Sequence, residues 1–136
     1  MKERSQPLLS LFHLGLAIHH LNQKAEKKLD MSLGQWCVLG HLIDMPATSA
    51  HALAKAVGVH PSTLTQALKR LETRGFVFMM EDPKDSRKKL ISMTRIGKNA
   101  FDRAEQVFGE HAKKLGEMNT DMLALRERIA AALQLT

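Results

Sequence analysis

The sequence contains a single cysteine and no long apolar run, and these two absences exclude several classes of protein. Cys37 stands alone among 136 residues, so an intrachain disulfide cannot form, which favours a cytoplasmic location. No apolar run reaches the roughly 18 residues that a membrane-spanning helix requires, and we expect no membrane association. Residues 8–18 could pass for a signal peptide, but His13 interrupts them and the apolar spacing continues beyond, which is typical of a helix.

Motifs of common catalytic and cofactor sites are also missing. The chain has no glycine-rich phosphate loop, no nucleophile elbow and no zinc-hydrolase motif. We therefore expect no enzymatic activity, no cofactor, no catalytic residue and no metal site. Cys37 and His41 are four residues apart, a spacing that places two metal ligands on one helix face, so metal or redox sensing remains an alternative. A thiol beside Trp36 in an apolar helix is usually inert, which counts against it.

Acidic residues are outnumbered by basic ones. The chain has 20 Lys and Arg residues against 14 Asp and Glu residues, a formal net charge of +6. A basic excess favours a negatively charged partner, either nucleic acid or an anionic surface, although a merely soluble basic protein would show the same balance. The length suits a single domain.

Apolar residues recur at three- and four-residue steps along most of the chain, which predicts a mainly helical protein. Residues 8–29 form one long amphipathic helix, and a second helix begins at Leu33 and ends before Pro46. Thr48 or Ser49 is expected to cap a short third helix.

The centre of the chain carries the pattern of a helix-turn-helix. Gly58 closes the short third helix, Pro61 suits the first position of a fourth helix, and Gly75 caps its end. On a helical wheel the fourth helix has an apolar side that must face the core: Leu64, Ala67, Leu68 and Leu71. Its outer side is interpreted as free of acids and offers groups that can bond base edges or phosphates: Ser62, Thr63, Thr65, Gln66, Lys69, Arg70 and Thr73. An ordinary solvated surface helix would show a similar pattern.

A basic β-hairpin is predicted next. Residues 76–81 and 88–93 are β-prone, and residues 82–87 have turn chemistry. A basic ribbon beside a recognition helix is well placed to enter the minor groove of DNA, where Arg87 and Lys88 would meet an enhanced negative potential. The Asp85 carboxylate, two residues before Arg87, could accept from the guanidinium and orient it; a solvated charged turn is the plainer interpretation.

Two further helices complete the predicted order. Thr94 can cap a long fifth helix with Gly97 in its first turn, and Asn119 or Thr120 can cap a sixth. The sixth has one apolar face: Met122, Leu125, Ile129 and Leu133. The terminal helices have more apolar surface than one small domain can bury, and intertwining with a second copy would cover it.

Several motifs together resemble the MarR (multiple antibiotic resistance regulator) family of winged helix-turn-helix regulators. In the second helix the similar stretch is residues 33–39. In the helix-turn-helix the similar residues are Leu53-Ala54, Gly58, Ser62-Thr63-Leu64-Thr65 and residues 71–77. In the wing they are residues 82–87 with its aspartate-x-arginine pair, followed by residues 93–97 with threonine-x-x-glycine. Met79 departs from the family, which often has a basic residue there, and Met93 replaces a more usual leucine.

The resemblance implies a mainly α fold with a small β-hairpin wing, and a homodimer that binds double-stranded DNA in adjacent major grooves. Residues 33–94 would be the DNA-binding lobe, and residues 5–30 and 95–136 the dimerisation helices. By matching position, Asp85 and Arg87 would be the wing pair. A ligand-responsive repressor of a pseudo-palindromic operator is the expected function.

The family's phenolic-ligand sites suggest, by analogy, a pocket for a small aromatic or phenolic effector. Its candidate lining residues are His13, Trp36, His41 and Phe101. The plainer interpretation is that these side chains pack the core. Two alternative functions remain: a metal- or redox-responsive regulator on the same fold, and a helical interaction module that does not bind DNA, which would leave the basic hairpin unexplained.

Overall fold

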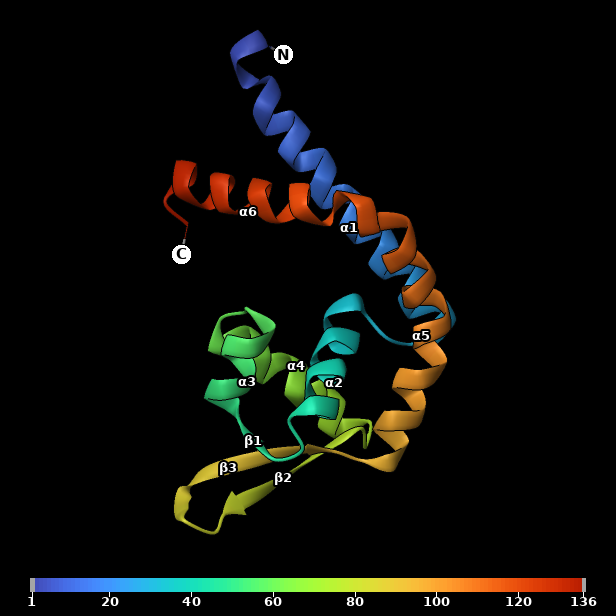
Figure 1. The fold of residues 1–136 in the computed structure, drawn as a ribbon, viewed down its shortest axis with the longest axis vertical. Helices are drawn as coiled ribbons and strands as arrows, with labels where there is room; N and C mark the ends of the chain where they lie inside the picture. The colour runs from blue at the N-terminus through green and yellow to red at the C-terminus, as the bar shows by residue number, and fades with distance from the viewer. Residues whose placement is uncertain (1, 136) are drawn as a thin grey trace. The chain divides into compact units, whose positions relative to one another are not determined.

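The computed structural model describes residues 2–135, which form two compact units. The first unit ends at Ala104 and holds the sheet and the first four α-helices; the second begins at Glu105, so helix α5 contributes to both. In chain order (Figure 1) the elements are η1 Glu3–Ser5, α1 Gln6–Leu29, α2 Leu33–Asp44, β1 Thr48–Ser49, α3 Ala50–Val57, α4 Pro61–Thr73, β2 Val77–Asp82, β3 Asp85–Met93, α5 Arg95–Leu115, η2 Gly116–Met118 and α6 Asn119–Leu133. The predicted class, a mainly helical winged helix-turn-helix, is confirmed.

The break between α1 and α2 is built from local hydrogen bonds. Helix α1 ends where Asp30 adopts the left-handed conformation, with φ of 54°. Ser32 Oγ accepts from the Gln35 N–H at 3.1 Å, and Gln35 Oε1 accepts from the Ser32 N–H at 3.2 Å, which makes a capping box. Asn22 Oδ1 accepts from the Leu33 N–H at 2.9 Å and ties α1 to α2. The sequence predicts this break, and its Ser-x-x-Gln pattern is also the signature of the capping box, which our prediction did not include.

The helix-turn-helix of α3 and α4 forms as predicted. Ser49 Oγ caps α3 by accepting from the Ala52 N–H at 3.1 Å. Gly58 and Gly75 follow α3 and α4 in the left-handed region, with φ of 82° and 74°, where a side chain would be strained. Pro61 occupies the first turn of α4, where its missing N–H costs nothing.

A third strand joins the predicted hairpin. The antiparallel sheet has the order β1-β3-β2, and β1 pairs Thr48 with Ile91 and Ser49 with Leu90. Thr48 is buried within this pairing, so only Ser49 acts as a helix cap. A strand of two residues is too short to show a period of two, which explains why the sequence did not predict it.

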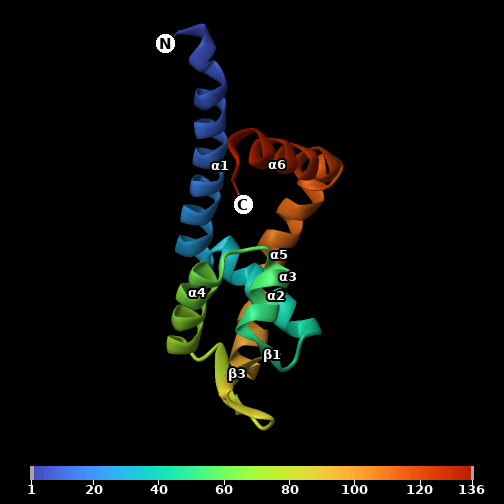
Figure 2. The same ribbon diagram turned by 90° about the vertical axis from the view of Figure 1, so that its left-hand side faces the viewer.

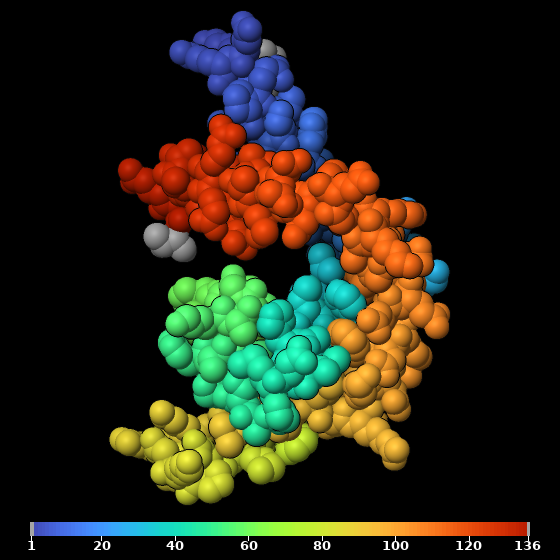
Figure 3. Space-filling view, in the orientation of Figure 1, coloured from blue at the N-terminus to red at the C-terminus, as the bar shows by residue number. Residues whose placement is uncertain are grey.

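The hairpin turn is shorter than the sequence predicts. Only Pro83 and Lys84 separate β2 from β3, since pairing continues to the ends of both strands. Asp85 and Arg87 therefore belong to β3, and placing them in the turn was wrong, because two residues suffice to reverse the chain. The register shifts near the tip, a bulge that increases local twist. The hairpin projects beyond α2 and α3 in Figure 3 and lies at the same end of this unit as α4 in Figure 2.

One apolar core holds the first unit together. Each of the elements α2, α3, α4 and β3 contributes to it, and each large aliphatic side chain it buries stabilises the fold by about 1.5–3 kcal/mol. The large side chains that are almost fully buried are Met31, Leu39, Leu42, Leu53, Leu64, Leu71 and Ile91. The predicted inward side of α4 is confirmed, with Leu64, Leu68 and Leu71 buried and Ala67 half-buried.

The start of α5 is held close to the end of α4. Thr94 Oγ1 donates to the Gly75 carbonyl at 2.5 Å and accepts from the Gly97 N–H at 3.0 Å, which confirms Thr94 as the cap of α5. The backbone of Gly97 lies against the Phe76 carbonyl group, and an added Cβ would come within 2.9 Å of the Phe76 carbonyl carbon. The threonine-x-x-glycine pattern is therefore a cap followed by a close backbone approach.

The terminal helices expose large apolar side chains. On α1 these include Leu8, Phe12 and Ile18, and on α6 they include Met122, Leu125 and Leu133. Asn119 is the first residue of α6 and follows η2 directly, so the prediction of an Asn119 or Thr120 cap was wrong: Met118, with helical backbone, holds that position. Among residues 2–135, no helix is long and apolar enough to cross a membrane.

Candidate nucleic-acid interface

The outer side of α4 is a continuous polar surface. The residues predicted to face outward are all exposed: Ser62, Thr63, Thr65, Gln66, Lys69, Arg70 and Thr73. The Thr65 hydroxyl donates to the Pro61 carbonyl at 2.9 Å, and the Thr73 hydroxyl donates to the Lys69 carbonyl at 2.9 Å. Their protons are therefore engaged within the helix, and toward a ligand these hydroxyls offer lone pairs. The donors that extend from this surface are the longer side chains of Gln66, Lys69 and Arg70.

A groove of about 690 Å³ runs between α4 and the wing. Lys69 from α4 and Lys88 from β3 line it, and such a cationic groove suits a phosphate backbone. Glu72 lines it too, so the prediction that this surface carries no acid was wrong on the side that faces the wing. Met79, where the family often has a basic residue, lines the groove with an uncharged side chain.

Two further groove residues were missed by the sequence analysis. His51 from α3 and Lys89 from β3 also line the groove. His51 lies in the first turn of α3, next to the capping Ser49, but only the folded structure shows that this turn faces the wing. Lys89 belongs to the run of basic residues that begins at Arg87, and this run is the sequence signal that could have identified Lys89 as a groove residue.

The wing carries a hydrogen-bonded pair with one exposed member. The Asp85 carboxylate accepts from the Arg87 backbone N–H at 3.0 Å and from Arg87 Nε at 3.2 Å. The two Arg87 bonds, backbone first, hold the pKa of Asp85 below its usual value, and nearby Lys88 lowers it further. The Arg87 side chain is 90% exposed, whereas that of Asp85 is 28% exposed. The ionised Asp85 carboxylate thus holds the Nε of Arg87 in place, while the rest of the Arg87 guanidinium extends into solvent.

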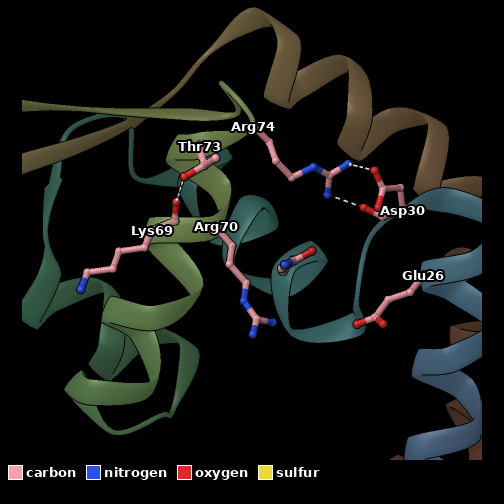
Figure 4. Close-up of a pocket in the computed structure, with 7 residues that line it drawn as sticks. Glu26, Asp30, Lys69, Arg70, Thr73 and Arg74 are labelled. Carbon is pink, nitrogen blue, oxygen red and sulfur yellow. Dashed lines mark hydrogen bonds and ion pairs between the residues drawn. The ribbon is translucent and has the colours of Figure 1, made fainter.

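A second hollow, of about 460 Å³, lies on the other side of α4 (Figure 4). Arg70 and Glu26 point into it from α4 and α1. Arg74 instead points to the end of α1, where it bonds the Asp30 carbonyl and holds the Asp30 carboxylate at 2.9 Å. Its guanidinium carbon also lies 4.4 Å from the centre of the Phe76 ring. The Arg74 side chain therefore stabilises the fold, whereas the Arg70 side chain is available to bind a ligand.

The four predicted effector-pocket residues are only partly brought together. Trp36 and Phe101 stack with ring centres 5.1 Å apart and planes 5° apart, and Gly40 leaves room for the Phe101 ring, which a Cβ there would approach to 3.2 Å. His41 is half-buried and its Nδ1–H donates to the Cys37 carbonyl at 2.8 Å. His13 is exposed on α1, and its ring neighbours that of Phe12 rather than the stack.

The proposed alternative of metal or redox sensing gains no support from this region. Burial raises the pKa of the Cys37 thiol, which lowers its thiolate fraction and its reactivity. Within residues 2–135, no three His, Cys, Asp or Glu side chains gather in a way that could hold a metal ion.

An exposed polar helix beside a projecting basic hairpin, on a helix-turn-helix scaffold, defines a winged helix-turn-helix DNA-binding protein. Comparison with known proteins shows which family this part of the chain is similar to. The model of the MarR family matches residues 29–88. The multiple antibiotic resistance protein MarR of Escherichia coli K12 is 27% identical over 136 residues, which cover 93% of this chain and 94% of that protein. Residues 29–88 are therefore similar to the MarR family, whose members are DNA-binding transcriptional regulators and not enzymes.

Two other relatives extend the comparison. The homoprotocatechuate degradative operon repressor of Escherichia coli is 28% identical over 89 residues, which cover 65% of this chain and 60% of that protein. The crystal structure of a MepR-like protein complexed with pseudoligands has a TM-score of 0.79 and 25% identity, and covers 98% of this chain and 97% of that one. The similarity in structure therefore extends through both terminal helices.

Proposed function

We propose that this regulator is a ligand-responsive repressor that binds a pseudo-palindromic DNA operator as a homodimer in the cytoplasm. The observation that carries the proposal is the placement, in one compact unit, of the exposed polar side of α4 next to the basic β3 wing. Repression is favoured by the similarity to a protein named as an operon repressor.

The two elements would have different roles on DNA. Gln66 and Lys69, near the centre of the outer side of α4, read bases in the major groove, because Gln can pair with adenine and Lys with guanine. Arg87 enters the minor groove from the wing, oriented by Asp85. The remaining contacts go to the backbone and flanking base edges: Ser62, Thr63, Thr65, Arg70 and Lys88.

Dimerisation would cover the exposed apolar side chains of the terminal helices. We assign residues 33–94 to the DNA-binding lobe and residues 5–30 and 95–136 to the dimer. Two-fold symmetry requires two half-sites whose centres lie about 10 bp apart, one turn of B-DNA.

The effector would be a small aromatic or phenolic compound bound beside the Trp36–Phe101 stack, with His41 and His13 as candidate polar partners. A ring-shaped ligand can extend an existing aromatic stack, and the Nε2 of His41 is free to accept, since its Nδ1 proton is held by the Cys37 carbonyl. A MepR-like relative that binds pseudoligands makes a small-molecule site reasonable.

The test is selection of duplexes from a random pool by the wild-type protein. We expect enrichment of an inverted repeat with the stated spacing. Replacing Gln66 or Lys69 with Ala should cost about 1–3 kcal/mol on that sequence and relax the preference at one position in each half-site. No enriched sequence at low salt, or an equal loss on selected and random duplexes, would contradict the proposal.

A further inference from the structure

We propose that His60 is an additional base-reading residue, which donates a hydrogen bond from Nε2 to N7 of adenine in the major groove while Ser62 accepts one from the N6 amino group of the same base. This inference rests on the proposed DNA binding through α4. It adds a residue absent from the predicted contact set and changes the role expected for Ser62.

The first step concerns the proton on the His60 ring. His60 occupies the N-cap of α4, and its Nδ1 accepts from the Ser62 backbone N–H at 3.1 Å. A backbone N–H can only donate, so Nδ1 carries no proton in this arrangement. The neutral ring must therefore hold its proton on Nε2, at the edge opposite the cap. Because the His60 side chain is exposed, this Nε2–H is open to a ligand.

The second step concerns the proton of the Ser62 hydroxyl. Ser62 Oγ lies 2.8 Å from the same Nδ1 of His60. Since that nitrogen is an acceptor, the hydroxyl must be the donor in this bond. The Ser62 hydroxyl can then offer only lone pairs outward, and the Ser62 backbone N–H, which the helix N-terminus would offer to a phosphate, is engaged by His60 as well. The hydroxyl is an acceptor, adjacent to the His60 donor.

The position of the pair makes both groups available for base contacts. They stand in the first turn of α4, before Gln66 on the same exposed side. In helix-turn-helix proteins the N-terminal residues of the recognition helix contact base edges. Pro61 lies between His60 and Ser62, and the pyrrolidine ring of Pro61 fixes its backbone φ angle. The backbone that positions the His60 cap is therefore restrained.

One donor beside one acceptor matches adenine, whose major-groove edge presents the N7 acceptor next to the N6 amino donor. Guanine presents two acceptors, N7 and O6, on that edge, and the amino donor of a G·C pair lies on the opposite base. The His60–Ser62 pair should therefore select an A·T pair at one position of each half-site, outside the positions read by Gln66 and Lys69.

The first experiment replaces His60 with a residue that still caps the helix. Serine is among the favoured N-cap residues, so His60→Ser removes the ring and retains a cap. On the sequence selected by the wild-type protein we expect binding to weaken by about fivefold for each half-site, as for one lost neutral hydrogen bond. The preference for A·T at one position should disappear, while the melting temperature and the affinity for random duplexes stay at their wild-type values.

Two matched variants complete the design. Ser62→Ala removes the hydroxyl but leaves the bond from the Ser62 backbone N–H to His60, so it should relax the same position as His60→Ser. Thr73→Ala removes an exposed hydroxyl at the opposite end of the same helix, and it should leave that position unchanged.

Unchanged base preference in His60→Ser would overturn the inference and leave His60 with a capping role alone. An equal loss on selected and random duplexes would also overturn it, since a backbone contact has no sequence preference. In either case a changed preference in Gln66→Ala would show that the proposed function stands. If the wild-type protein enriches no sequence at all, the proposed function itself fails.

Discussion

At the scale of single residues, replacing Asp85 in the wing pair Asp85–Arg87 distinguishes two explanations, because they predict opposite changes in DNA affinity. Asp85→Ala removes a negative charge near DNA, and simple electrostatics predicts tighter binding. The bonds from Asp85 to Arg87 predict weaker binding, because the free guanidinium would lose its orientation. Since the pKa of Asp85 lies below its usual value, the carboxylate is ionised throughout the neutral range, and the effect should not vary with pH there.

The measurement is operator affinity as a function of salt. Arg87→Ala should weaken binding to all sequences and reduce the log–log salt slope by about 0.9, the contribution of one phosphate contact. The double variant should bind no worse than Arg87→Ala alone, because Asp85 acts only through the arginine. Tighter binding by Asp85→Ala, with fold and dimer intact, would show that Asp85 has no orienting role.

Arg74 provides a second prediction, on stability. It joins the end of α1 to the end of α4 through Asp30 and also lies over the Phe76 ring. Arg74→Ala should lower the free energy of unfolding by about 1–2 kcal/mol, the combined value of a charged hydrogen bond and an exposed cation–π contact. Asp30→Asn should cost less than about 1 kcal/mol, because its side chain is exposed and Asn tolerates the left-handed backbone. Equal losses in denaturant unfolding would contradict this division.

At the scale of elements, the start of α5 lies close to the chain that follows α4, and this predicts how a methyl group added at Gly97 changes stability. Gly97→Ala would force Cβ against the Phe76 carbonyl and should destabilise the protein by about 1–3 kcal/mol, the usual cost of overpacking. Gly109→Ala is the matched control in the same helix, since the nearest atom to its added Cβ would be 3.8 Å away. It should instead stabilise α5 by about 0.5–1 kcal/mol through helix propensity. Thermal unfolding that moves in the same direction for both variants would contradict the packing explanation.

At the scale of the whole molecule, the apolar surface of the terminal helices predicts the oligomeric state. Phe12 is 61% exposed on α1, and in a dimer its burial should contribute about 1.5–3 kcal/mol from each copy. Phe12→Lys should therefore raise the dimer dissociation constant by at least tenfold in sedimentation experiments and weaken operator binding. Lys24→Glu, at an exposed charged position of α1, is the control. A wild-type protein that sediments as a monomer at micromolar concentration would contradict the dimer.

The effector proposal has a direct optical readout. Trp36 is the only tryptophan, and the chain has no tyrosine, so tryptophan fluorescence comes only from the residue that stacks on Phe101. A small aromatic acid that binds there should change this fluorescence and weaken operator binding in the same concentration range, because a ligand shifts an equilibrium through its differential affinity for two states. Phe101→Leu should reduce both effects. A broad set of such acids that alters neither signal nor melting temperature would argue against the pocket.

Local chemistry was enough to predict much of this protein from its sequence. The left-handed glycines Gly58 and Gly75, Pro61 at the start of α4 and the Thr94 cap each act within a few residues, so their effects are visible in the chain itself. The apolar and polar sides of α4 follow from the same local periodicity. The wing pair could also be anticipated, because its two members are two residues apart.

Other features depend on contacts between distant segments and were decided by the tertiary structure. Strand β1 exists because Thr48 and Ser49 pair with β3, some forty residues later in the chain, and no local sequence pattern predicts this pairing. The groove that joins His51, Lys69 and Lys88 forms only when α3, α4 and β3 pack on one core. Likewise Glu72 lies at the flank of the outer side of α4 on a helical wheel, and only the fold shows that this flank faces the wing. A sequence specifies which side chains are available, whereas long-range packing decides which of them share a site.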